Sequence, residues 1–168
     1  MWSKISRKFS RQRVRVDIAR KMIECGMRVR EDKKLYVGDV EVDYTAVANA
    51  VDVDRRVVKQ TVGQIMEDEF LRSIFPNLKP FGPSLVPVVS KLGYSAIVIE
   101  ADPKSAGVMA AVTRILAENN IVIRQALAED PDMVPDAKMT LVIEGNLSGE
   151  AISKIRNLEQ IKTVKILK

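Results

Sequence analysis

Prolines cluster near the middle of this chain, where positions 76, 80, 83 and 87 fall within the stretch PNLKPFGPSLVPVVSKLG. Proline removes a backbone N–H donor and fixes φ, so neither a helix nor a central strand can run through a segment of this composition. We therefore interpret residues 76–93 as a semi-rigid linker. It divides the 168 residues into two parts, 1–75 and 94–168, each expected to fold as a small domain.

The C-terminal part alternates between two hydrophobic periods. Residues 95–101, 121–128 and 138–145 alternate as strands do, and Val164 with Ile166 supplies a last strand. Helical spacing recurs over residues 108–118 and again after Ser148, which is a good helix cap. The order βαββαβ predicts a ferredoxin-like split-βαβ domain, with two helices on one face of an antiparallel sheet. The predicted fold class is α+β.

The N-terminal part reads as helices interrupted by one hairpin. Val14, Ile18, Met22 and Val29 recur at near-helical spacing, which predicts a basic amphipathic helix ending near residue 26. LYV and VEV at 35–37 and 40–42 flank a Gly-Asp turn and predict a short hairpin. Asp43 and Asp54 are then placed to cap a short helix over 44–51 and a longer one over 55–70.

A short helix, a tight turn and a second helix form the pattern of a helix-turn-helix domain, here a winged one if the hairpin is its wing. Residues 1–83 hold 17 Lys and Arg against 12 Asp and Glu, whereas residues 84–168 hold ten of each. All the excess positive charge therefore lies in the N-terminal half, which favours a polyanion partner over a merely solvated helix face. The candidate DNA-binding residues are Arg11, Arg13, Arg15, Arg55, Arg56, Lys59 and Gln60.

The segment from Asp102 to Gly107 joins the first C-terminal strand to its helix. Either Asp102, with Pro103 at the first helical position, or Ser105 is placed to cap that helix. Free amides at a helix start attract a carboxylate, and a glycine there lets a ligand approach the backbone. The same residues also suit an ordinary capped turn. Asn119 and Asn120, after the helix, read more simply as a C-cap than as a ligand contact.

Several classes of function are disfavoured by what the chain lacks. It has no histidine and a single cysteine, Cys25, whose spacing predicts a small buried thiol, so Ser-His and Cys-His hydrolases and most transition-metal sites are unexpected. Glu129, Asp130, Asp132 and Asp136 suit a solvated loop better than a cation site. No apolar run reaches the roughly 18 residues of a membrane span. We expect a cytoplasmic protein that is not an enzyme and needs no cofactor or metal.

Three features of the C-terminal part resemble the ACT domain, a small regulatory module that binds amino acids or similar metabolites. They are the βαββαβ order, the D-x-x-x-x-G turn ending at Gly107, and the helix-to-strand step ILAENNIVI. The whole chain resembles archaeal predicted regulators of amino-acid metabolism that place an ACT domain behind a DNA-binding-like region. AVANAVDVDRRVVKQTVGQIMEDEFLRSIF and LGYSAIVIEADPKSAGVM carry that likeness.

The resemblance implies an amino-acid effector bound between paired copies of the domain, in a homodimer or a higher oligomer. Serine-binding ACT domains carry particular polar residues where this chain has Lys104 and Val122, so an apolar or acidic ligand fits at least as well here. The ligand-binding residues that the resemblance implies are Asp102, Lys104, Ser105, Ala106, Gly107, Asn120, Ile121 and Val122.

Two functions follow as hypotheses. The first is a ligand-responsive transcriptional regulator of amino-acid metabolism. In it, an effector that binds near Gly107 changes the relative orientation of two DNA-binding domains. The alternative is a non-catalytic regulatory subunit that binds a biosynthetic enzyme and confers feedback control, with the basic helix as its docking surface.

Overall fold

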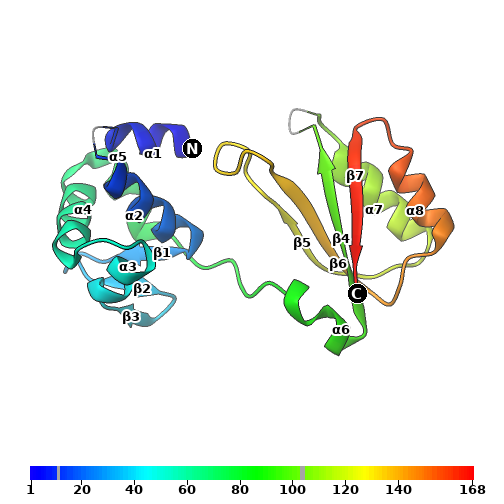
Figure 1. The fold of residues 1–168 in the computed structure, drawn as a ribbon, viewed down its shortest axis with the longest axis horizontal. Coiled ribbons are helices and arrows are strands. Elements are labelled where there is room, and N and C mark those ends of the chain that lie inside the picture. The colour runs from blue at the N-terminus through cyan, green and yellow to red at the C-terminus, as the bar shows by residue number, and fades with distance from the viewer. Residues whose placement is uncertain (11, 103–104) are drawn as a thin grey trace. The chain divides into compact units, whose positions relative to one another are not determined.

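A computed structural model describes residues 1–10, 12–102 and 105–168. The chain forms two compact units, Met1–Gly82 and Pro83–Lys168, here called the first and second unit (Figure 1). Both combine helices with an antiparallel sheet, so the structure is mixed α+β, as predicted. Among the described residues, no helix has the length and apolar character that crossing a bilayer requires.

The first unit packs helices around a small sheet of order β1-β2-β3. The predicted hairpin is confirmed as β2 and β3, and both precede the helix pair α3 and α4. Its elements are α1 (Trp2–Lys8), α2 (Arg13–Glu24), β1 (Met27–Val29), β2 (Leu35–Val37), β3 (Val40–Val42), α3 (Tyr44–Ala50), α4 (Arg55–Glu67), α5 (Glu69–Ile74) and a 3₁₀ turn (Phe75–Asn77).

Side-chain caps define the starts of three helices in this unit. The Asp43 carboxylate accepts a 2.7 Å hydrogen bond from the Thr45 amide, and Asp54 accepts one of the same length from Arg56, so both predicted caps are confirmed. The prediction of a single helix over residues 55–70 is wrong. The helix breaks at Asp68, whose extended backbone ends α4 and whose carboxylate caps α5 through the Leu71 amide.

The end of α2 corrects two expectations from the helical spacing. Val29, which was counted in the helical spacing, lies in β1 beyond the predicted helix end, and the Cys25 thiol is exposed instead of buried. The chain turns at Gly26 with φ of +59°, and a Cβ there would lie 2.4 Å from the Lys79 carbonyl carbon. Only glycine fits this close approach, which is why the helix stops where it was predicted to.

The second unit is built on a four-stranded antiparallel sheet of order β5-β6-β4-β7. The element order β4-α7-β5-β6-α8-β7 is the predicted βαββαβ. The elements are a 3₁₀ turn (Val86–Val88), α6 (Val89–Leu92), β4 (Tyr94–Ala101), α7 (Val108–Glu118), β5 (Ile123–Ala128), β6 (Lys138–Glu144), α8 (Gly149–Arg156) and β7 (Ile161–Leu167).

Helices α7 and α8 cover one face of this sheet (Figure 1). The main core lies between them and the strands, with Ile97, Leu141, Leu116 and Ile155 fully buried. Alternation along the strands turns Ala96 and Val142 to the opposite face, where they pack against residues 85–89. Part of the predicted linker, residues 76–93, therefore forms 3₁₀ turns and a short helix, with Pro76 and Pro87 near the starts of the two 3₁₀ turns.

Candidate functional site

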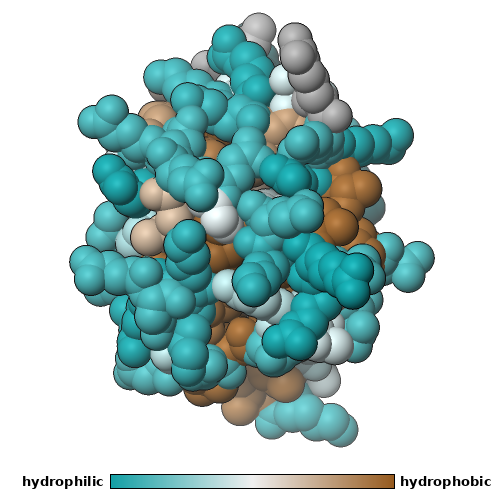
Figure 2. Space-filling view, turned by 90° about the vertical axis from the view of Figure 1, so that its left-hand side faces the viewer, coloured by the Kyte–Doolittle hydropathy of each residue, from teal (hydrophilic) through white to brown (hydrophobic). Residues whose placement is uncertain are grey.

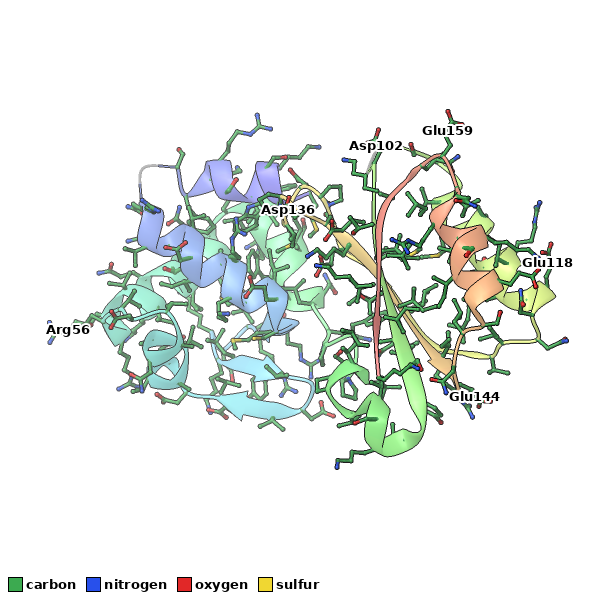
Figure 3. The ribbon with its side chains drawn as sticks, turned by 45° about the vertical axis from the view of Figure 1, so that its right-hand side comes forward. Arg56, Asp102, Glu118, Asp136, Glu144 and Glu159 are labelled. Atoms are coloured by element: carbon green, nitrogen blue, oxygen red, sulfur yellow. The ribbon has the colours of Figure 1, made fainter. Side chains whose placement is uncertain are left out.

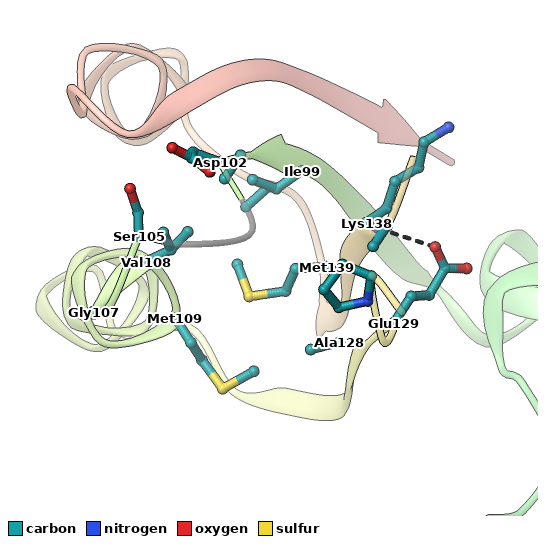
Figure 4. A pocket seen from close by; sticks show the side chains of 13 residues that line it. Ile99, Asp102, Ser105, Gly107, Val108, Met109, Ala128, Glu129, Lys138 and Met139 are labelled. Atoms are coloured by element: carbon teal, nitrogen blue, oxygen red, sulfur yellow. Dashed lines mark hydrogen bonds between the residues drawn. The ribbon is translucent and has the colours of Figure 1, made fainter. Parts of the chain in front are cut away.

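A cavity of about 260 Å³ opens at the end of β4 in the second unit, between the start of α7 and the β5–β6 hairpin (Figure 4). Its wall is largely apolar, and its polar side chains stand around that wall. The apolar part is made by Ile99, Ala101, Val108, Met109, Ala128, Pro131, Ala137 and Met139, and the polar part by Asp102, Ser105, Glu129 and Lys138.

Three of the predicted ligand-binding residues, Asp102, Ser105 and Gly107, line this cavity. Ala106 is exposed beside it, and Lys104 lies outside the described residues. Figure 3 shows the Asp102 side chain at the outer end of β4. The turn that sequence reasoning selected therefore supplies one wall of the cavity.

Helix α7 begins later than the capping residues predicted. Gly107, with φ of +87°, is the N-cap, and no described side chain caps the helix, so the caps expected at Asp102 and Ser105 are wrong. The Ser105 amide instead donates to the Asp102 carbonyl oxygen over 3.0 Å, which closes a turn before the helix. Gly107, Val108 and Met109, at the start of α7, line the cavity, and the positive end of the helix dipole favours an anionic group there.

Two charged residues of the wall, Glu129 and Lys138, interact with neighbouring residues. The Lys138 amide donates to Glu129 over 2.9 Å, as Figure 4 shows. The Lys138 ammonium pairs with Glu100 over 3.3 Å. Hydrogen bonds from Thr163 and then Lys138 lower the pKa of Glu100, which keeps this pair charged. The cavity interior is left to methionine and aliphatic side chains, which suit an apolar group of a ligand.

Asn120, Ile121 and Val122 do not line this cavity. The 11 residues of α7 separate them from Gly107 by about 16 Å. Asn120, with φ of +54°, donates to the Ala117 carbonyl oxygen, and the Ile121 amide donates to Leu116 over 3.0 Å. This is a Schellman C-cap, so the simpler interpretation of Asn120 is confirmed.

The carboxylate loop at 129–136 forms a turn. The Asp130 carboxylate accepts from the Asp132 amide over 2.9 Å. Among the residues that the structure describes, no group of three or more metal-ligating side chains is placed to hold an ion.

The candidate nucleic-acid surface lies on α4 in the first unit. Val58, Val62 and Ile65 are buried against the rest of the unit, whereas Arg55, Arg56, Lys59 and Gln60 are exposed. Figure 3 shows Arg56 extending away from the unit. Figure 2 views the chain from the side on which α4 lies and shows a mostly hydrophilic face with small apolar areas.

The predicted DNA-binding residues divide into free and engaged groups. Arg15 donates to Gln64 over 2.6 Å and to Gln60 over 3.1 Å, so Arg15 and Gln60 tie α2 to α4. Arg55 lies 3.7 Å from the Asp43 carboxylate. Arg13 is exposed near the start of α2, and Arg11 lies outside the described residues. The exposed Arg56 and Lys59 remain as the best-placed contacts.

Sequence reasoning missed the apolar cavity residues. Ile99, Met109, Ala128 and Met139 come from four elements, and only the paired sheet brings them together. Met109 is 41% exposed in the first turn of α7, and this exposure is visible in the structure but not in the sequence.

No family model matches this chain, and no curated protein matches it significantly. Similar solved structures include a homoserine dehydrogenase from Thiobacillus denitrificans, with 20% identity over 79% of this chain and a TM-score of 0.36. This chain spans only 30% of that dehydrogenase.

Two further structures match nearly the whole chain. The protein PH0061 shares 12% identity over 93% of this chain and 90% of its own, with a TM-score of 0.29. A transcriptional regulatory protein of the AsnC family from Pyrococcus furiosus, PF0864, shares 8% identity over 92% of this chain and 86% of its own, with a TM-score of 0.28. Likenesses this weak carry no argument about function.

Proposed function

We propose that this protein is a ligand-responsive transcriptional regulator that binds DNA through its first unit. One observation carries the proposal: Arg56 and Lys59 stand exposed at the start of α4, the second helix of a tightly turned pair. Residues near the start of such a helix reach base edges in the major groove, where Arg and Lys pair with guanine. The turn between the helices is closed by the Val53 amide, which donates to the Ala48 carbonyl oxygen over 3.0 Å.

The proposed effector site is the cavity beside Gly107. Its methionine and aliphatic wall suits an apolar side chain, and the amides at the start of α7 suit a carboxylate. An amino acid offers both groups, and the resemblance in the sequence points to amino-acid metabolism. The ligand acts only if it binds two arrangements of the protein with different affinity.

The proposed assembly is a homodimer or higher oligomer formed through the second unit. In a two-fold dimer the two α4 helices address half-sites one helical turn, about 34 Å, or a multiple of it apart. The proposal assigns binding, not catalysis, to both units.

DNA binding is tested by mobility-shift titration of the full chain against genomic fragments. Arg56→Ala is expected to cost about 1–3 kcal/mol on a preferred site if the guanidinium reads a guanine. Lys91→Ala, on the exposed side of α6 in the second unit, is the control with the same change in charge. Equal affinity for every fragment and for random DNA, without salt dependence, contradicts the proposal. Co-purification of a biosynthetic enzyme together with that indifference would instead favour the regulatory subunit.

Effector binding is tested by thermal shift with the amino acids, since a ligand that binds only the folded state raises the melting temperature. Gly107→Ala and Gly145→Ala both place a side chain at positive φ, +87° and +65°, and each added Cβ meets no other atom within 4 Å. Both variants should lose similar stability, about 1–2 kcal/mol. Only Gly107→Ala should lose the ligand response. A panel without any stabilising amino acid contradicts this part of the proposal.

A further inference from the structure

Helix α1 is amphipathic in a way that leaves a row of cations facing outward. Trp2 and Ile5, with Phe9 just after the helix, are 5% exposed or less and anchor it in the first unit. Lys4, Arg7 and Lys8 are exposed and stand at spacings i, i+3 and i+4, so they share the other face. None of the three belongs to the candidate DNA-binding residues on α2 and α4.

A groove of about 490 Å³ runs along this row, lined by Lys4, Arg7, Lys8 and Phe70. Lys8 is held in place by Asp68, 2.8 Å away, and its ammonium lies 5.9 Å from the centre of the Phe70 ring. Among the described residues, the Arg7 side chain makes one hydrogen bond, in which its Nε donates to the Ser3 carbonyl oxygen over 3.0 Å. Within the described part of the chain, the Lys4 ammonium has no ion-pair partner. Two cations are therefore available to an anionic partner.

This row is joined to the exposed face of α4 by direct contacts. The Gln64 side-chain amide donates to the Lys8 carbonyl oxygen over 3.1 Å. Arg15 then bridges Gln64 and Gln60, and Gln60 lies one turn from Arg56 on α4. The three helices that carry these basic residues, α1, α2 and α4, are thus tied together within the first unit.

We propose that α1 is a second DNA-contact element, whose cations bind backbone phosphates flanking the segment that α4 reads. This inference rests on the proposed DNA binding and names a further surface for it. Lys4 and Arg7 are about 4.5 Å apart along the helix axis. Successive phosphates of one strand advance about 3.4 Å along the duplex, so these two long side chains can reach neighbouring phosphates. Continuity with α4 favours duplex DNA over an acidic protein segment as the occupant.

The test compares the full chain with Lys4→Gln/Arg7→Gln by fluorescence anisotropy, using a preferred and a random duplex over a series of salt concentrations. Each lost phosphate contact lowers the slope of log affinity against log salt by about 0.9, so the double variant should lose about 1.8. The affinity for both duplexes should fall by the same factor, because phosphates carry no sequence information. Lys91→Gln/Lys162→Gln, exposed in the second unit, removes the same charge and should leave the slope unchanged.

The outcomes separate this inference from the proposed function. Absence of DNA binding by the unmodified chain overturns the proposed function itself. Binding by the unmodified chain with an unchanged slope in Lys4→Gln/Arg7→Gln overturns only the role of α1. A change in preference between the two duplexes overturns backbone contact in favour of base reading. Poly-glutamate serves as a probe for an acidic protein partner. If Lys4→Gln/Arg7→Gln loses binding to poly-glutamate while its DNA affinity is unchanged, the groove binds an acidic protein and not DNA.

Discussion

At the scale of single residues, the packing of the first unit does not explain why position 63 is glycine. Gly63 lies inside α4, on the exposed side that also carries Arg56 and Gln60, and a Cβ built there meets nothing within 4 Å. Glycine inside a helix costs about 1 kcal/mol relative to alanine. Packing within the unit gives no reason for this cost, whereas the proposed DNA binding would give one, through close approach of a DNA backbone to α4.

Gly63→Ala should therefore change stability and DNA affinity in opposite directions. We expect about 1 kcal/mol more stability in urea denaturation, and weaker DNA binding in anisotropy titrations. Gly149→Ala, at the start of α8 and also free of contacts within 4 Å, is the matched control that should leave DNA binding unchanged. Unaltered affinity in Gly63→Ala contradicts a close approach at this point of α4.

At the scale of elements, Asp68 connects three helices of the first unit. It ends α4, caps α5 through the Leu71 amide over 3.0 Å and pairs with Lys8 at the end of α1. The hydrogen bond from Lys8, with the Leu71 amide, lowers the pKa of Asp68. A carboxylate whose pKa is lowered by folding stabilises the protein above its unfolded pKa of about 3.9 and loses this effect as the pH falls through the folded value.

Asp68→Asn isolates the charge, because asparagine is itself a good N-cap. We expect the variant to be less stable than the unmodified chain at pH 6, and the difference to shrink as the pH falls toward 3. Thermal unfolding of the two proteins between pH 6 and pH 3 measures this. A difference that stays constant over that range would show that the Lys8 pair contributes nothing through charge.

The segment before β4 is held against the sheet by the hydrogen bonds of one side chain and by apolar packing. Gln125 on β5 donates to the Pro83 carbonyl oxygen over 2.9 Å and accepts from the Leu85 amide over 3.0 Å. Leu85 and Val89 also pack on the sheet face opposite α7 and α8. The two hydrogen bonds hold residues 83–85 where the chain enters the second unit.

Gln125→Ala should release this segment without unfolding the sheet. Hydrogen exchange of the Leu85 amide should accelerate, while amides paired between β4 and β6 keep their protection. Thr140→Ala, a half-buried position on the central strand β6, is a control that leaves both hydrogen bonds of Gln125 in place. Unchanged exchange at Leu85 in Gln125→Ala would mean that apolar packing alone holds the segment.

At the scale of the whole molecule, each unit has its own buried residues and its own sheet. We predict that fragments 1–82 and 83–168 fold separately, each with a cooperative thermal transition by circular dichroism. Fragment 94–168 should melt below fragment 83–168, because it lacks the packing of Leu85 and Val89 on Ala96 and Val142. Equal melting temperatures would place the start of the folded domain at the residue predicted from the prolines.

The sequence by itself determined the features that depend on neighbours along the chain. Caps at Asp43, Asp54 and Ser148 form within three residues of the capping side chain, so residue type and spacing suffice to predict them. The strand and helix order of residues 94–168 follows from periodicity for the same reason, because burial on one face selects apolar residues at a fixed interval.

Tertiary structure alone decided what depends on distant partners. Asp102 and Ser105 were both candidates to cap α7, whereas the folded chain starts this helix directly after Gly107. The break at Asp68 lets α5 and α1 meet through Lys8, 60 residues away in sequence. The cavity wall joins Ile99 to Met139, and strand pairing sets that neighbourhood. Local propensity carries no information about such contacts, because their free energy appears only when the whole unit packs.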